Sequence, residues 1–286
     1  MTTDAYVLRR PDRQVAPVVL SSPHSGNWYP PEFLARSVLD RHTIRSSEDA
    51  FVDRLFAAAP GMGLPLLAAR APRAYLDLNR APEEMDPAVV EGVDWPPHNP
   101  RVSSGLGVIP RVVAGGRAIY AGKLSRHEAE QRLARFWHPW HAALRLLVDE
   151  TQARFGEAVL IDCHSMPHEA IEGHARPGTP PPEVVLGDRY GAAAGRGVVD
   201  RVEAAFQAAG LRVSRNAPFA GAHIAQAYGR PSQGVHVIQV EIDRALYMDE
   251  ARITPRRDFE AFRARIDGVL GRIVAGWAPG LPLAAE

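Results

Sequence analysis

The sequence predicts an α/β fold in which helices cover both faces of a mixed or largely parallel β-sheet. Short apolar segments typical of buried strands occur at residues 16–21, 158–163 and 236–242. Longer segments with helical spacing of apolar residues separate or follow them, at about 125–155, 190–209 and 255–276. Because strands alternate with helices, we expect a ligand to bind beyond the carboxyl ends of the strands.

The first half of the chain is expected to contain strands and one helix before a long irregular stretch. The elements are a strand at 16–21, a helix over 46–59 ended by Pro60-Gly61, and strands at 64–69 and 74–78. The loop Pro23-His24-Ser25-Gly26 leaves the first of these strands. Residues 81–117 are rich in proline and glycine without clear periodicity, which indicates an irregular insertion or lid.

The second half of the chain is predicted to begin with a long helix. Ser125 and Glu128 have the spacing of a capping box, so the helix should start there and run towards Gly156, with a kink or a split at Pro139. The elements after it are a strand at 158–163, a Pro-rich loop near 177–182, a helix at 190–209, strands near 211–214 and 236–242, and a final helix at 255–276.

Composition indicates an ordinary globular protein. The chain has 286 residues, 46% of them hydrophobic and 23% charged, a length compatible with one domain or two, and we expect a single domain over 1–286. Acidic and basic residues balance at 33 each, so no net field favours nucleic acid or an anionic membrane as a partner. A small-molecule substrate is the expected partner, and the oligomeric state stays open.

Cysteine usage and the N-terminus bear on the compartment. Cys163 is the only cysteine, which excludes an intramolecular disulfide and cysteine-rich zinc sites. Residues 1–10 lack the apolar run of a signal peptide, and no segment approaches the roughly 20 apolar residues that span a bilayer. We therefore expect a cytoplasmic protein.

Three side chains offer the donors of a catalytic zinc site, which needs histidine nitrogens and carboxylate oxygens with one place left for water. His24 follows one predicted strand, His164 closes another, and Asp49 lies in the first turn of the predicted helix between them. Residue types alone leave alternatives open. Asp49 could instead complete a capping box with Ser46, and Glu48 competes with it for a metal.

Other histidines and Cys163 have simpler interpretations. His138 and His141 are three residues apart on a helix and could meet on one face, but such residues are more often half-buried packing residues. Cys163 and His164 resemble a nucleophile and its base, yet neighbours on a strand point to opposite faces. Cys163 is therefore expected in the core.

Two charged residues stand at positions that favour a functional role. Arg80 ends the predicted strand at 74–78, where its planar fork suits a substrate carboxylate or an oxyanion, although a surface ion pair is the commoner fate of an arginine. Glu241 lies inside an apolar strand, where a buried carboxylate needs a partner or a chemical role.

Several segments, in this order, resemble the N-formylglutamate amidohydrolase family. They are Pro23-His24-Ser25-Gly26 with Tyr29-Pro30, Glu48-Asp49-Ala50-Phe51-Val52-Asp53, Asp77-Leu78-Asn79-Arg80, Gly107-Val108-Ile109-Pro110-Arg111, Asp162-Cys163-His164-Ser165, and the run from Gly229-Arg230-Pro231 to Tyr247-Met248-Asp249-Glu250. The resemblance spans most of the chain. It implies a three-layer αβα sandwich related to zinc exopeptidases and aspartoacylase-like deacylases.

The resemblance also implies roles for individual residues. His24, Asp49 and His164 match the ligands of one zinc ion, with Asp49 a better match than Glu48. Glu241 matches the glutamate that activates water, and Asn79 with Arg80 matches the pair that meets the substrate. We also expect Arg111 to bind the substrate together with Asn79 and Arg80.

The implied activity is hydrolysis of N-formyl-L-glutamate to formate and L-glutamate. The alternatives are a related zinc amidase or carboxypeptidase-like hydrolase of another N-acyl amino acid or small peptide, and a non-catalytic homologue that binds carboxylates. Residues 167–189 do not align with the family, and such loops commonly set specificity. A Gly-x-Ser-x-Gly elbow is absent from the sequence, which argues against a serine hydrolase.

Overall fold

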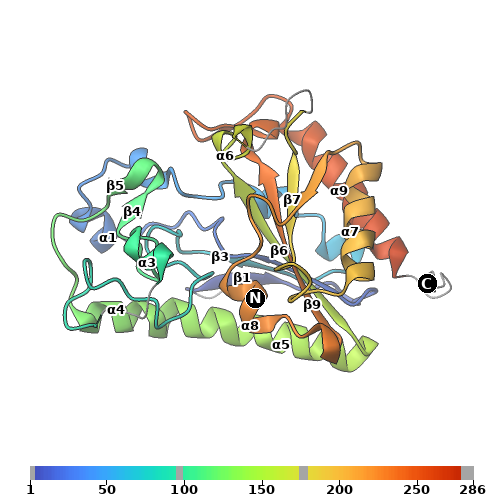
Figure 1. Cartoon of the computed structure of the whole chain (residues 1–286), viewed down its shortest axis with the longest axis horizontal. Helices are drawn as coiled ribbons and strands as arrows, with labels where there is room; N and C mark the ends of the chain where they lie inside the picture. The colour runs from blue at the N-terminus through green and yellow to red at the C-terminus, as the bar shows by residue number, and fades with distance from the viewer. Residues whose placement is uncertain (1–3, 95–98, 174–179, 278–286) are drawn as a thin grey trace.

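A seven-stranded mixed sheet forms the centre of the computed structural model, which describes residues 4–94, 99–173 and 180–277 (Figure 1). The strand order is β1-β3-β2-β6-β9-β7-β8. The strands are β1 (Tyr6–Arg9), β2 (Val18–Ser22), β3 (Leu66–Ala69), β6 (Ala158–Met166), β7 (Val184–Gly187), β8 (Val213–Arg215) and β9 (Val235–Asp243). Four neighbouring pairs are parallel, and β1 with β3 and β7 with β9 are antiparallel. The α/β fold with a mostly parallel sheet is confirmed.

Helices flank both faces of this sheet (Figure 1). They are α1 (Pro31–Arg36), α2 (Val52–Leu55), α3 (Pro100–Ser103), α4 (Arg126–Arg132), α5 (His138–Phe155), α6 (Glu169–Glu172), α7 (Arg196–Ala208), α8 (His223–Tyr228) and α9 (Phe259–Gly276). The short hairpins are β4 (Val112–Val113) with β5 (Arg117–Ala118), and β10 (Met248–Asp249) with β11 (Thr254–Pro255). Within the described residues, no helix combines the length and apolar character that crossing a membrane requires.

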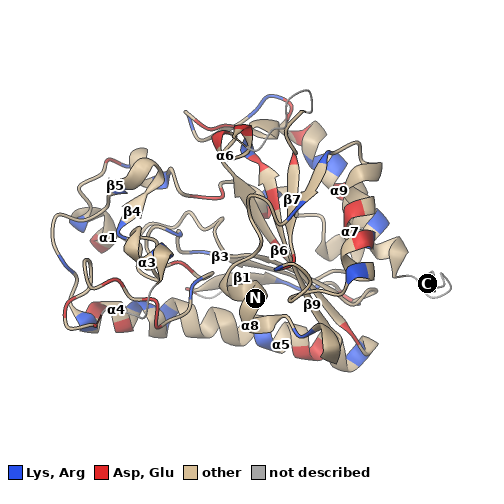
Figure 2. Ribbon diagram, viewed as in Figure 1, with Lys and Arg blue, Asp and Glu red and all other residues tan. Residues whose placement is uncertain are grey.

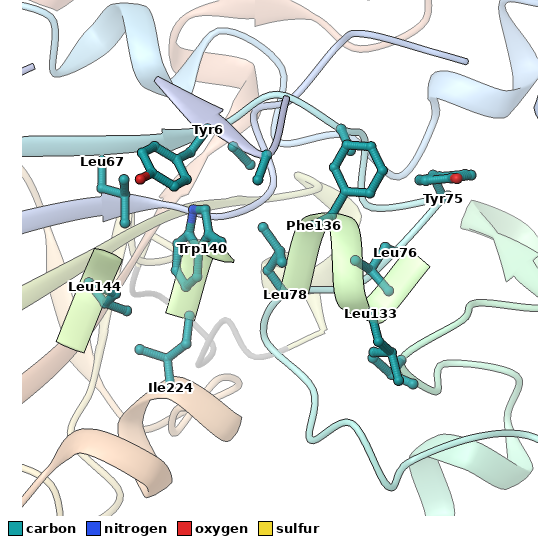
Figure 3. Close-up of a cluster of buried hydrophobic side chains, with 14 of the residues drawn as sticks. Tyr6, Leu67, Tyr75, Leu76, Leu78, Leu133, Phe136, Trp140, Leu144 and Ile224 are labelled. Carbon is teal, nitrogen blue, oxygen red and sulfur yellow. The ribbon is translucent and has the colours of Figure 1, made fainter. Parts of the chain in front are cut away.

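The central strands β6 and β9 separate two apolar clusters. In β6, Leu160 packs in the cluster that includes α4 and α5, whereas Ile161 and Cys163 pack in the cluster that includes α7 and α9. This alternation follows from the pleat, which sends successive side chains to opposite faces. Figure 3 shows the first cluster, in which Trp140 and Leu144 of α5 face the sheet and Ile224 of α8.

The long helical run begins where the sequence predicts it. The Ser125 hydroxyl accepts the Glu128 N–H at 3.2 Å, as an N-cap does. The run is divided by a π-helical turn at Leu133–Trp137, immediately before Pro139. A proline has no N–H to give to the preceding turn, and the widened turn accommodates that missing hydrogen bond without ending the run.

Two elements predicted in the first half are wrong. Only Val52–Leu55 is α-helical within 46–59, and Phe51 before it has a positive φ of 68°, so Asp49 lies in a loop and not in a helical turn. Residues 74–78 form turns and not a strand. Their apolar side chains are buried in the first cluster although the backbone is irregular, so the apolar sequence resembles that of a buried strand.

Two short strands of the central sheet, β1 and β7, were not predicted. β1 is an edge strand, and β7 follows the Pro-rich loop, of which residues 174–179 lie outside the described part of the chain. The described residues of the segment 81–117, which are 81–94 and 99–117, are mostly irregular and lie beside the sheet with α1 (Figure 1). Charges of both signs are scattered over most elements (Figure 2), in agreement with the balanced composition.

Candidate active site and metal centre

Three buried side chains from distant segments meet at the carboxyl ends of β2 and β6. His24 lies two residues beyond β2, His164 lies within β6, and Asp49 is placed by its own N–H, which donates to the His24 carbonyl at 3.1 Å. One ligand atom from each of the three lies within 4.8 Å of the other two. The convergence expected from the sequence is therefore present, and this group is able to hold a metal ion.

The orientation of the two imidazoles suits a cation. Their Nδ1 atoms are 3.1 Å apart, and both face Asp49 Oδ2, at 3.4 Å from His24 and 3.0 Å from His164. Each Nε2 faces a buried carboxylate, that of Asp77 at 2.7 Å and that of Asp162 at 2.8 Å. Hydrogens on the Nε2 atoms leave two Nδ1 lone pairs pointing at each other, an arrangement that only a proton or a cation between them relieves.

The electrostatics of the group also favour positive charge. Burial opposes ionisation of Asp49 and Asp77, but hydrogen bonds from His164 and His24 to Asp49, and the charges of Arg73 and His24 beside Asp77, hold both carboxyl pKa values well below the ordinary value. Burial lowers the pKa of His164, and Asp162 outweighs it and raises that pKa well above its ordinary value. The acids therefore remain ionised, and a bound cation would replace a proton on the imidazoles.

The acidic member of the group is Asp49 and not Glu48. Asp49 Oδ1 accepts from Arg244 Nη2 at 3.0 Å and from the Ser165 hydroxyl at 3.3 Å, which leaves Oδ2 for the imidazoles. The Glu48 carboxylate instead accepts from Arg45 and from Tyr29 Oη. No helix begins at Ser46, and the Ser46 hydroxyl forms no hydrogen bond with Asp49, so the capping-box interpretation is excluded.

Glu241 lies beside His164 in the sheet. β6 and β9 pair in register, with His164 opposite Glu241 and Asp162 opposite Gln239, so these four side chains project from one face. Glu241 is 8% exposed and accepts from Gln239 Nε2 at 2.8 Å. Burial raises the pKa of Glu241 to about 7, while the neighbouring His164 opposes that rise. A carboxyl group of this kind can take up and release a proton near neutral pH.

Asn79 and Arg80 line the same cavity from the turn segment after Asp77. Asn79 Oδ1 accepts the Ile224 N–H at 2.7 Å, and Asn79 Nδ2 donates to Gln239 Oε1 at 3.3 Å. Arg80 is 2% exposed, and its guanidinium donates to the carbonyl oxygens of Leu106 and Asn79. No carboxylate of the described residues forms an ion pair with Arg80, so its charge is available to an anion.

The cavity that joins these residues has a volume of about 400 Å³, a size typical of small-molecule sites. Four arginines line it: Arg73, Arg80, Arg101 and Arg244. Arg111 lies outside that lining, although Pro110 and Val112 belong to it. The Arg111 side chain is turned to Asp86 Oδ2 at 2.9 Å and to the Ser103 carbonyl at 3.3 Å, so it anchors α3.

The simpler interpretations of the remaining histidines and Cys163 agree with the structure. His141 Nε2 donates to the Leu78 carbonyl, and its Nδ1 lies 2.9 Å from Tyr228 Oη, which makes it a packing residue between α5 and α8. Cys163 is fully buried on the face opposite the site, where burial raises the pKa of its thiol. A nucleophile–base pair of Cys163 and His164 is therefore excluded.

Sequence reasoning assigned no role to the residues that hold the ligands. Asp77 and Asp162 lie in two of the segments that resemble the family. Asp77 precedes Asn79 by two residues, and Asp162 precedes His164 by two residues, so closeness to an expected site residue was a usable signal for both. Arg73 and Arg244 carry no local signal, because each acts on a carboxylate brought close only by the fold.

Comparison with known proteins decides the family. The family model described as N-formylglutamate amidohydrolase matches residues 16–248. The chain belongs to the N-formylglutamate amidohydrolase family. It is 31% identical over 268 residues to N-formylglutamate deformylase of Pseudomonas aeruginosa, covering 91% of this chain and 93% of the relative. It is 27% identical to the Pseudomonas putida protein of the same name, covering 85% and 86%.

Solved structures agree with this family membership. A crystal structure of N-formylglutamate amidohydrolase from Ralstonia eutropha aligns with a TM-score of 0.89 at 35% identity, covering 98% of this chain and all of that one. A protein from Agrobacterium tumefaciens aligns with a TM-score of 0.63 at 17% identity and 95% coverage of both chains, which is a likeness in fold alone.

Proposed function

We propose that this amidohydrolase is zinc-dependent and hydrolyses N-formyl-L-glutamate to formate and L-glutamate. The observation that carries the proposal is the placement of two imidazole Nδ1 atoms and a carboxylate oxygen within 4.8 Å, with Glu241 in register beside His164. The choice of substrate is supported by the two Pseudomonas relatives, which are N-formylglutamate deformylases.

The donor set suits zinc, which binds histidine nitrogen and carboxylate oxygen and retains an open position at catalytic sites. His24, Asp49 and His164 would hold the zinc ion, whose Lewis acidity would lower the pKa of water towards neutrality and polarise a carbonyl. Asp77, Asp162 and Arg244 would keep the three side chains oriented for it.

Glu241 is proposed to carry the proton. As the water oxygen bonds to the formyl carbon, one water proton passes to the Glu241 carboxylate. As the carbon–nitrogen bond breaks, the same proton passes to the leaving amine nitrogen, so Glu241 returns to its ionised state. The burial that raises its pKa to about 7 makes both transfers favourable near neutral pH.

Arg80 is proposed to hold the substrate's α-carboxylate or to stabilise the oxyanion. Its guanidinium is buried in the cavity wall and satisfied only by carbonyl oxygens among the described residues, so a substrate carboxylate would supply the missing opposite charge. Asn79 shares that wall, and contact with the substrate is proposed for it as well.

The test pairs metal content with formate release. The protein purified without chelators should hold one zinc per chain and release formate from N-formyl-L-glutamate. His164→Ala should lose both the metal and the activity. A panel of N-formyl, N-acetyl and N-succinyl amino acids separates the proposed substrate from other N-acyl amino acids. Absence of metal together with no hydrolysis of any panel member would overturn the proposal in favour of a non-catalytic homologue.

A further inference from the structure

One arginine of the cavity stands apart from the other three in its partners. Arg73 is paired with Asp77, Arg244 with Asp49, and the guanidinium of Arg80 is engaged by two carbonyl oxygens. Arg101 of α3 also lines the cavity, but its side chain is exposed and forms an ion pair with no carboxylate of the described residues. Among the residues that the structure describes, Arg101 thus has no acidic partner and contributes a positive charge to the cavity wall.

An acidic side chain on that wall, Glu84, forms hydrogen bonds to other groups. Glu84 and Arg101 line an adjoining cavity together. However, Glu84 Oε1 accepts the Ala81 N–H at 3.1 Å, and Glu84 Oε2 accepts from Asn99 Nδ2 at 3.2 Å. Glu84 is thus held by Ala81 and Asn99, and among the described residues it forms no direct ion pair with Arg101.

Arg80 and Arg101 raise the electrostatic cost of an empty chamber. Burial lowers the pKa of Arg80, Asp77 opposes that fall, and the like charges of Arg73 and Arg101 add to it. Two guanidinium groups that repel each other across a cavity are stabilised when an anion with two negative groups lies between them.

The burial of the lining residues orders the chamber from its closed end to its open end. His24, Asp49 and His164 are 1–2% exposed, Arg80 is 2% exposed, and Arg101 is exposed to solvent. The scissile amide must reach the buried ligands, so the part of the substrate farthest from that amide must lie towards the exposed rim. In an N-formyl amino acid with an acidic side chain, that part is the side-chain carboxylate.

Resting on the proposed function, we propose that Arg101 binds the side-chain carboxylate of the substrate and so selects acidic N-acyl amino acids over neutral ones. Arg80 then holds the α-carboxylate nearer to the scissile bond. Because a carboxylate and an amide of the same shape differ mainly in charge, the selection acts between glutamate and glutamine.

The segment that carries Arg101 is held firmly enough for this role. Asn99 Oδ1 accepts the backbone N–H groups of Arg101 and Val102, and Val102 is buried. Arg111, bound to Asp86, also donates to the Ser103 carbonyl. These contacts fix the short helix α3 against the core, so that Arg101 needs to order little more than its own side chain on binding.

The test compares kcat/KM for N-formyl-L-glutamate and N-formyl-L-glutamine in four proteins. They are the parent, Arg101→Gln, Arg101→Lys and the control Arg196→Gln. Arg196 lies on α7 away from the cavity lining, its side chain is 88% exposed, and its replacement removes the same unit of charge. Zinc content and thermal unfolding, measured on all four, check that each protein is folded and loaded.

Arg101→Gln should lower the glutamate-to-glutamine ratio of kcat/KM by about 10- to 100-fold, mainly through the KM for N-formyl-L-glutamate, as loss of a charged hydrogen bond implies. Arg101→Lys should restore part of the ratio, and Arg196→Gln should leave it unchanged. An unchanged ratio in Arg101→Gln, or an equal fall for both substrates, would overturn the role of Arg101 while the proposed function stands. A parent that releases formate from neither substrate would instead overturn the proposed function, and this inference with it.

Discussion

Glu241→Gln tests both the proposed catalytic role of Glu241 and the effect of its burial on stability. The amide has nearly the shape of the carboxylate it replaces and can still accept from Gln239 Nε2 through its carbonyl oxygen, so the strand pairing of β9 should persist. Without the carboxylate, no group at this position takes the water's proton. We expect kcat to fall about 10²- to 10⁴-fold, the usual range for a lost general base, while the zinc content stays that of the parent.

The same substitution should stabilise the metal-free protein at high pH. Burial raises the pKa of Glu241 from an ordinary value of 4.5 to about 7, so between those pH values the folded protein binds more protons than the unfolded chain. Stability therefore falls as pH rises through this window, by roughly 3 kcal/mol at about 1.4 kcal/mol per pH unit, and the whole deficit is present above pH 7. Glutamine has no such deficit.

The assay is urea unfolding of both proteins after removal of metal with a chelator, at intervals from pH 4 to pH 8.5, beside formate release from the zinc-loaded proteins. The two unfolding free energies should coincide near pH 4, and the variant should be the more stable protein above pH 7. Equal stability at every pH would refute the burial argument for Glu241. Retained turnover would remove Glu241 from the proposed mechanism, whatever the unfolding data show.

Three further predictions concern the ligand support, a buried histidine and the core. Arg244→Met removes the guanidinium that holds Asp49 Oδ1, and zinc affinity measured by chelator competition should fall about 10- to 100-fold; an unchanged affinity would deny Arg244 a supporting role. Burial lowers the pKa of His141 to about 3, so the free energy of unfolding should fall as pH falls from 6.5 towards 3. In urea unfolding, the parent should lose up to about 1.4 kcal/mol per pH unit more than His141→Gln over this range. Parallel pH profiles of the two proteins would contradict this. Trp140→Ala should cost about 3–5 kcal/mol in urea unfolding, against less than about 0.5 kcal/mol for the control Leu146→Ala on the exposed side of the same helix, and similar losses in the two would show that the α5 face is misassigned.

The sequence identified the parts of the site that follow long, regular elements. His164 and Glu241 lie in β6 and β9, which are nine residues each, and the apolar segments of these strands are long enough to be recognised locally. His24 follows β2 directly, and the expectation that side chains after parallel strands meet at one sheet edge holds for it. Position relative to regular strands is thus predictable from local pattern.

The rest depends on contacts between distant segments. Asp49 lies in a loop beside a four-residue helix, and its place is fixed by the His24 carbonyl and by Arg244, neither of which periodicity reveals. The turn that carries Asp77 looked like a strand because its apolar side chains are buried in irregular backbone. Only the resemblance to the family placed Asp49 above Glu48, and the geometry now gives the physical reason.

The residues proposed for the reaction lie in regular strands, whereas the residue proposed to select the substrate lies in an irregular segment. A slip of one residue between β6 and β9 would turn either His164 or Glu241 towards the apolar face that holds Cys163, so the two groups proposed for the reaction are tied to the register of the most extensively paired strands. Arg101 lies in the irregular segment 81–117, where a substitution changes the cavity rim without disturbing that register. A related chain could therefore accept a different N-acyl amino acid by changing this segment alone, with the same ligands and the same base.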